Sequence, residues 1–217
     1  RRYLFSKNST HVINVISSIS VIGVAVATMA LVIVLSVFNG FHDLVATLFT
    51  SFDPQLKVVP VEGKTAPADD PILTQIRQLP QVDVATETVE DQALAVYQGR
   101  QAMVKIKGVD DNFAEMSHIT DILYGDGTFS LHAANLQYGT LGIRLAQTLG
   151  VGAQWDGFLK IYAPKKEGQL VDMANPSDGF VADSLNSPGV LFAVKQSKYD
   201  KNYIVTSISF ARNLFGQ

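Results

Sequence analysis

The chain has 217 residues, of which 17 are Lys or Arg and 20 are Asp or Glu, and its formal net charge is −3. Charged residues make up 17% of the chain, below the roughly 25% of an average soluble domain. There is no Cys, which excludes disulfide scaffolds and thiolate zinc sites and is compatible with a location outside the cytoplasm. The negative net charge argues against nucleic acid as a partner.

One long stretch near the N-terminus carries no charge at all. It runs from Val12 to Phe38, and as a helix it would be roughly 40 Å long, enough to cross a hydrocarbon core of about 30 Å. A secretory signal has a shorter apolar region, and here more apolar sequence follows the small residues 25–27 that resemble a cleavage site. The sequence therefore predicts an uncleaved transmembrane helix at 12–38; the alternative is a buried core helix of a soluble protein.

The flanking charges predict how this helix is oriented. Arg1, Arg2 and Lys7 precede it, and all 20 acidic residues follow Phe38. Because positively charged flanks stay in the cytoplasm, residues 1–11 are predicted to be a cytoplasmic tail and the large downstream part to lie outside.

Small residues form a stripe along the predicted span. Ser20, Gly23, Ala27 and Ala30 recur at i, i+3, i+7 and i+10. In lipid, helices associate by close backbone approach at such stripes. The stripe favours packing against other membrane helices; the alternative is a lone anchor with incidental small residues.

Residues 39–54 predict an amphipathic helical extension of the span. Its apolar residues follow a helical period, and Asp53-Pro54 is expected to end it. The apolar stripe predicts either contact with acyl chains or a lipid-like cargo, or packing on the chain's own folded domain. The stripe consists of Phe41, Leu44, Val45, Leu48, Phe49 and Phe52.

The downstream part begins with a β-α-β-β pattern. Residues 55–61 predict a short strand, and Asp70 and Pro71 the start of a helix that Pro80 ends. Residues 82–97 predict one or two strands, and a turn at 98–100 leads to a strand at 101–109. In that last strand Val104 and Ile106 alternate with Lys105 and Lys107, which predicts one apolar and one polar face.

Residues 110–157 predict a separate lobe, after which the sheet resumes. The lobe has a short helix at 110–117 and a second helix with Leu141, Leu145 and Leu149 on one face, capped by Thr140 and ended by Gly150. A strand at 158–162, a polar loop at 165–189, strands at 190–194 and 203–206, and a helix at 209–215 ended by Gly216 follow. The predicted fold class is an α+β domain preceded by one long transmembrane helix.

Common catalytic and nucleotide-binding motifs are absent. The sequence has no G-x-x-x-x-G-K-[ST], H-E-x-x-H or G-x-S-x-G pattern. The four histidines, His11, His42, His118 and His132, are too scattered to indicate a metal site. We therefore expect no enzyme, no bound cofactor and no metal ion in this chain.

Several segments resemble a known family. Residues 35–41, LSVFNGF, are similar to the end of the first membrane helix in lipoprotein-releasing ABC permeases of the LolC/LolE type, within the MacB/FtsX-like superfamily. Weaker similarities occur at 2–4, 19–25, 142–151, 157–164, 189–193 and 199–216.

The resemblance implies the N-terminal part of a permease in the bacterial inner membrane, with its main domain in the periplasm. That domain would be a MacB-like periplasmic core, with a porter lobe formed by 55–109 and 158–217 and an inserted lobe at 110–157. The full permease would have three more membrane helices, which we expect beyond residue 217. A separate cytoplasmic subunit would bind and hydrolyse ATP.

The resemblance also implies partners and contact residues. The permease would pair with a second copy or a paralogue, extract acylated lipoprotein, and pass it to a periplasmic chaperone that binds the loop at 165–189 through Met173, Pro176 and Phe180. Alternatives are a MacB/FtsX-like permease for efflux, toxin export or regulation of a cell-wall hydrolase, or a single-pass membrane protein with an extracytoplasmic binding domain. The implied lipid- or cargo-facing residues are Phe38, Phe41, Leu44, Val45, Leu48 and Phe49.

Overall fold

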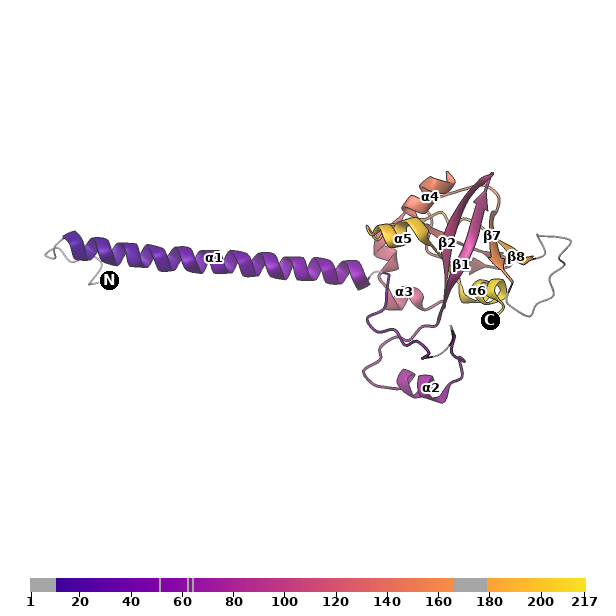
Figure 1. Cartoon of the computed structure of the whole chain (residues 1–217), viewed down its shortest axis with the longest axis horizontal. Coiled ribbons are helices and arrows are strands. Elements are labelled where there is room, and N and C mark those ends of the chain that lie inside the picture. The colour runs from indigo at the N-terminus through magenta and orange to yellow at the C-terminus, as the bar shows by residue number, and fades with distance from the viewer. Residues whose placement is uncertain (1–10, 51, 62, 64, 166–178) are drawn as a thin grey trace. The chain divides into compact units, whose positions relative to one another are not determined.

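The computed structural model describes residues 11–50, 52–61, 63, 65–165 and 179–217. These residues form two compact units, one ending at Thr47 and one from Leu48 to Gln217, which we describe separately (Figure 1). Met173 and Pro176 of the predicted partner loop lie outside the described residues.

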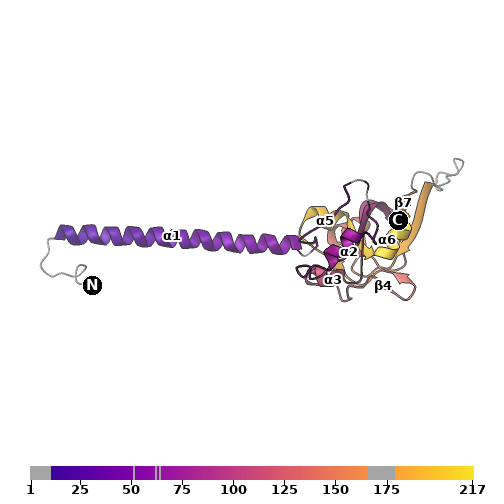
Figure 2. The same ribbon diagram turned by 90° about the horizontal axis from the view of Figure 1, so that it is seen from below.

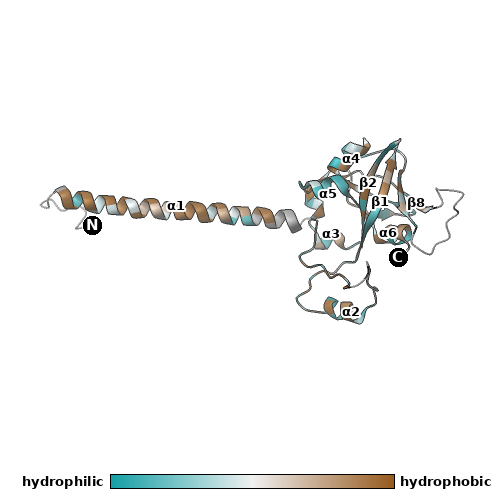
Figure 3. Ribbon diagram, in the orientation of Figure 1, coloured by the Kyte–Doolittle hydropathy of each residue, from teal (hydrophilic) through white to brown (hydrophobic). Residues whose placement is uncertain are grey.

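The first unit holds most of helix α1, which runs from His11 to Thr50. Figures 1 and 2 show it as a continuous helix, so the predicted span and most of its amphipathic extension form a single element. Its segment Val12–His42 is long and apolar enough to cross a membrane, and none of the most apolar window is buried. Figure 3 shows this helix coloured mainly as hydrophobic. Helix α1 ends before Asp53-Pro54, as the proline predicted.

The second unit is built on a mixed sheet of eight strands in the order β3-β9-β6-β10-β2-β1-β7-β8. Its central pair is a long hairpin, and β10 runs parallel to β2 while β7 is antiparallel to β1. The strands are β1 (Thr88–Tyr97), β2 (Arg100–Val109), β3 (Leu123–Tyr124), β6 (Thr140–Gly142), β7 (Leu159–Pro164), β8 (Phe180–Leu185), β9 (Leu191–Phe192) and β10 (Tyr203–Ser207), and a separate pair is β4 (His132–Ala133) with β5 (Leu136–Gln137).

Short helices connect or cover these strands. They are α2 (Pro71–Arg77), α3 (Phe113–Met116), the 3-10 helix η1 (Ile119–Ile122), α4 (Ile143–Leu149), α5 (Ser197–Asn202) and α6 (Ile208–Phe215). The second unit is therefore a mixed α+β domain, and with α1 it confirms the predicted fold class.

Local sequence signals account for several of the observed boundaries. The β1–β2 hairpin turns at Gln98 and Gly99, both with positive φ, the backbone conformation that a tight hairpin turn requires. Asp70 Oδ1 accepts a hydrogen bond of 2.8 Å from the Ile72 N–H and caps α2, with Pro71 in the first turn, as predicted. Gly150 and Gly216 end α4 and α6 in the left-handed conformation, also as predicted.

Other predicted elements were wrong. Residues 55–61 are not a strand: Leu56, Val58 and Val59 are exposed, and a strand needs a neighbouring backbone as partner. Thr140 does not cap α4 but lies buried in β6, and Gly142 takes the cap position. The predicted loop at 165–189 contains strand β8, which pairs with β7 through its backbone although its sequence alternates poorly. Helix α5 had not been predicted.

Strands from 110–157 share the large sheet with strands from 55–109 and 158–217, since β6 lies between β9 and β10. The division of the domain into a porter lobe and an inserted lobe stays a prediction.

Buried side chains form two clusters, and strand β2 contributes residues to both. Ile106 belongs to the cluster with α4 and α6, whereas Val109 belongs to the cluster with Phe113, Phe192 and Tyr203. Helix α6 packs so closely on β2 that a Cβ at Gly108 would lie only 2.3 Å from the Cβ of Ala211. The sheet therefore has buried apolar contacts on both of its faces.

Candidate functional site

The small-residue stripe of α1 is exposed along the helix. Ser20, Gly23, Ala27 and Ala30 are all exposed, and a Cβ at Gly23 would meet nothing within 4 Å outside the helix's own backbone. The Ser20 hydroxyl donates a 3.0 Å hydrogen bond to the Ile16 carbonyl within the helix. The stripe thus presents small side chains at the helix surface, and its packing role stays a prediction.

The predicted lipid- or cargo-facing residues lie on the C-terminal half of α1. Phe38, Phe41 and Leu44 are 67%, 61% and 58% exposed, and Val45 is half-buried. The side chains of Leu48 and Phe49 lie outside the described part of the chain. Whether this stripe contacts lipid or cargo stays a prediction.

The sixth residue of the amphipathic stripe, Phe52, is buried in the folded domain. Only 1% of it is exposed, and it follows Thr50, the last residue of α1, by two positions. Its ring lies 5.1 Å from that of Phe192, 4.8 Å from that of Tyr199 and 5.5 Å, edge-on, from that of Tyr203. These centroid distances are those of favourable aromatic pairs.

A buried lysine on β2 holds the same segment. Lys107 is 1% exposed, and its Nζ donates a 3.0 Å hydrogen bond to the Phe52 carbonyl. Its ammonium also lies 4.3 Å from the centre of the Phe52 ring, within the range of a cation–π contact. At Lys107, the face of β2 that the sequence predicts to be polar is therefore buried.

Two carboxylates balance this buried charge. Lys107 Nζ lies 3.5 Å from Asp53 Oδ1 and 3.7 Å from Glu90 Oε1, and Glu90 is the cross-strand neighbour of Lys107 on β1. Burial lowers the pKa of Lys107 from its ordinary value, and Glu90 and Asp53 oppose that shift. Tyr199 donates a hydrogen bond from its hydroxyl to the other carboxylate oxygen of Asp53.

Two tyrosines whose rings pack on Phe52, Tyr199 and Tyr203, are held in their neutral form. Burial raises the pKa of Tyr199, and its hydrogen bond to Asp53 raises it further. Burial raises the pKa of Tyr203 to about 12. We call Phe52, Asp53, Glu90, Lys107 and Tyr199 the junction cluster; sequence reasoning missed it because nothing local shows that residues 53, 90, 107 and 199 meet.

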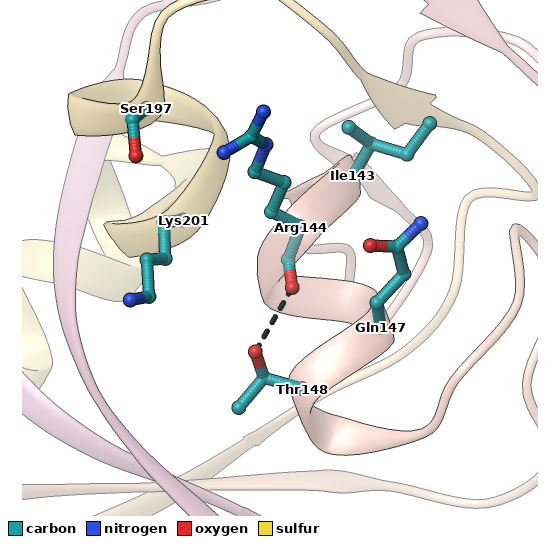
Figure 4. Close-up of a pocket in the computed structure, with 6 residues that line it drawn as sticks. All are labelled: Ile143, Arg144, Gln147, Thr148, Ser197 and Lys201. Atoms are coloured by element: carbon teal, nitrogen blue, oxygen red, sulfur yellow. Dashed lines mark hydrogen bonds between the residues drawn. The ribbon is translucent and has the colours of Figure 1, made fainter.

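A second polar region is an open pocket between α4 and α5 (Figure 4). Arg144 and Lys201 contribute its two cationic side chains. Arg144 also acts electrostatically on buried Asp200. Burial raises the pKa of Asp200 overall, although hydrogen bonds from the N–H groups of Val194 and Lys195 and the charge of Arg144 each oppose that rise. Within the described ranges, no group of three His, Asp or Glu side chains could hold a metal ion.

Of the three predicted chaperone-contact residues, Phe180 is the one that lies in the described part of the chain. It is the first residue of β8 and is 48% exposed.

A model of the MacB-like periplasmic core domain matches residues 17–157. The chain belongs to this family. The match covers most of α1 and the domain as far as the turn before β7, and so includes Phe52, Glu90 and Lys107. No match was found among the curated proteins.

Family membership implies an ABC-type permease superfamily and, in general, an ABC ATPase partner. The apolar helix α1 and the periplasmic-type domain fit a membrane protein.

Proposed function

We propose that the chain is the N-terminal part of the permease subunit of an ABC transporter that extracts lipoproteins from the bacterial inner membrane. The ATP is hydrolysed by a separate subunit, and this chain has no catalytic role of its own. One observation carries the proposal: a helix long enough to span a membrane runs directly into a MacB-like periplasmic core domain.

The charge distribution supports the orientation. Arg1, Arg2 and Lys7 lie before the span, and every acidic residue lies after it. The positive-inside rule then puts the N-terminus in the cytoplasm and the folded domain in the periplasm.

The exposed stripe of α1 supports an amphiphilic cargo. Phe38, Phe41 and Leu44 continue the apolar surface of the span toward the folded domain. Acyl chains of a lipoprotein in the outer leaflet would find apolar surface there as they leave the bilayer. The small-residue stripe with Gly23 serves contact with the other membrane helices of the permease pair.

A photo-crosslinking residue at Phe41 tests the cargo. In membranes of cells that carry the whole transporter, we expect covalent capture of acylated lipoprotein. The matched control is the same crosslinker at Lys160, an exposed position on β7, which should give no lipoprotein adduct. Capture of an unacylated small molecule or toxin at Phe41 would instead favour the efflux or toxin-export function, with which the family is equally consistent.

A crosslinker at Phe180 tests the proposed periplasmic chaperone. We expect a chaperone adduct at Phe180 and none at Lys160. A transporter that releases lipoprotein without any adduct at Phe180 would remove this residue from the chaperone contact.

A further inference from the structure

The pocket between α4 and α5 brings two cationic side chains to one place. Arg144 comes from α4 and Lys201 from α5, and the open pocket that both line has a volume of about 670 Å³ (Figure 4). Within the described part of the chain, neither cation forms an ion pair with a carboxylate. A pocket lined by positive charge alone attracts an anion.

The one carboxylate of α5 does not fill this role. Asp200 is 3% exposed and is not among the residues that line the pocket. It accepts a 2.8 Å hydrogen bond at Oδ1 from the Val194 N–H, and the Lys195 N–H also binds it. Its carboxylate is therefore committed to the backbone before α5, and the cations remain available to a ligand.

Neutral hydrogen-bond donors line the same pocket. The Ser197 hydroxyl and the Gln147 amide belong to it, and among the described residues neither side chain has a hydrogen-bond partner. The Thr148 hydroxyl differs, because it donates a 3.0 Å hydrogen bond to the Arg144 carbonyl (Figure 4). Guanidinium, ammonium, hydroxyl and amide groups are the donors that proteins use for phosphate oxygens.

The positive charge continues along the surface beside the pocket. Lys195, Lys198 and Lys201 are all exposed on α5 or just before it. Of the chain's 17 basic residues three precede the membrane span, so that 14 stand against 20 acidic residues in the part that follows. This cationic surface therefore contrasts with the acidic balance of the domain that carries it.

The length of the chain limits how far α5 can lie from lipid headgroups. Phe52 follows Phe38, the last residue of the charge-free run, by 14 positions. A helix as far as Thr50 and two extended residues reach at most about 25 Å. Within the folded domain, the ring of Tyr199 on α5 packs 4.8 Å from that of Phe52. This short tether favours a lipid headgroup over a soluble anion or an acidic protein.

We propose that the pocket between α4 and α5 binds the phosphate group of an anionic phospholipid headgroup. Arg144 and Lys201 supply the positive charge, and Ser197 and Gln147 supply neutral donors. The proposal rests on the membrane location of α1 in the proposed function, and it does not depend on the cargo.

A photo-crosslinking residue at Thr148 tests the occupant, because this side chain lines the pocket while its hydroxyl is already bound. The full chain is placed in vesicles of phosphatidylcholine and phosphatidylglycerol, and the adduct is identified by its mass. We expect phosphatidylglycerol to be captured in preference to phosphatidylcholine. The matched control is the same crosslinker at Lys160, on β7, which should show no such preference.

Charge variants with the crosslinker kept at Thr148 test the ligand residues. Arg144→Gln and Lys201→Gln should each lower the phosphatidylglycerol adduct about fivefold, as expected for one basic residue beside an anionic lipid surface. Lys160→Gln removes an exposed lysine outside the pocket and should leave the adduct unchanged. Arg144 also acts on Asp200, so Lys201→Gln decides the matter if Arg144→Gln lowers the urea midpoint.

Three results would overturn the proposal. The first is an adduct that is equal in Lys201→Gln or equal for phosphatidylcholine. The second is loss of the adduct when inorganic phosphate is added at the concentration of the lipid headgroups, which would make free phosphate the ligand. The third is capture of an acidic protein in place of phospholipid in cell membranes. If Thr148 captures phosphatidylglycerol while Phe41 captures no lipoprotein, the proposed cargo fails and the pocket assignment stands.

Discussion

Replacing Phe52 with alanine removes the aromatic side chain through which the segment after the membrane helix enters the folded domain. Phe52 is 1% exposed and contacts three other rings. A buried Phe→Ala change costs about 3–5 kcal/mol, from lost burial and the cavity that is left. The Lys107 ammonium also loses the ring 4.3 Å away, so we expect the upper part of that range.

The chain itself supplies the probe for this measurement. Its one Trp, Trp155, is 9% exposed and belongs to the other buried cluster, with α4 and α6. Urea unfolding of the full chain in detergent micelles, followed by Trp155 fluorescence, should show a lower midpoint in Phe52→Ala with an unchanged slope. A shift seen by Trp155 also shows that the two clusters unfold together.

The matched control is Phe158→Ala, at a position that is 58% exposed. A surface substitution of this kind should change the free energy of unfolding by no more than about 0.5 kcal/mol. If Phe52→Ala and Phe158→Ala shift the midpoint equally, the contacts of Phe52 in the junction cluster do not stabilise the folded domain, and the reasoning is refuted.

Three further predictions follow from other parts of the chain. Gly108→Ala places a Cβ 2.3 Å from that of Ala211, and the same urea assay should show a loss of about 1–3 kcal/mol from overpacking. Burial raises the pKa of Glu87, but hydrogen bonds from two arginines outweigh it and lower the pKa overall; Glu87→Gln should therefore flatten the fall in the free energy of unfolding between about pH 5 and pH 3. In intact spheroplasts, an impermeant maleimide should modify Lys160→Cys but not Lys7→Cys.

Each of these has its own control or contrary result. Gly152→Ala, whose Cβ would lie 3.4 Å from the nearest carbonyl oxygen, should leave the midpoint unchanged. The expected pH dependence for Glu87 follows from its lowered pKa in the folded state. The ionised carboxylate stabilises the fold at pH values above the pKa it has in the unfolded chain, and this stabilisation is lost as the pH falls. A steeper acid decline in Glu87→Gln would contradict it. Modification of Lys7→Cys alone would reverse the proposed orientation.

Elements that depend only on neighbouring residues could be predicted from the sequence. The charge-free run at 12–38 predicts a membrane-length helix because length and apolarity are properties of the segment itself. The capping of α2 by Asp70 and the turn at Gln98 and Gly99 depend on neighbouring residues only, and the family-like segment at 35–41 lies within one helix.

The errors occur where an element depends on a distant partner. Residues 55–61 have the composition of a strand but are exposed without forming one, whereas residues 180–185 alternate poorly and form β8 because β7 offers its backbone. The burial of Lys107 follows from the same dependence, since Phe52 lies 55 positions away in sequence.

By itself, then, the sequence determined a bilayer-length helix with a basic N-terminal flank and an α+β domain after it, because hydropathy, charge and turn preferences act over a few residues. Only the tertiary structure decided the strand order and the meeting of residues 52, 53, 90, 107 and 199 within the folded domain. Such contacts depend on how strands pair across the chain, and no short pattern of residues specifies that pairing.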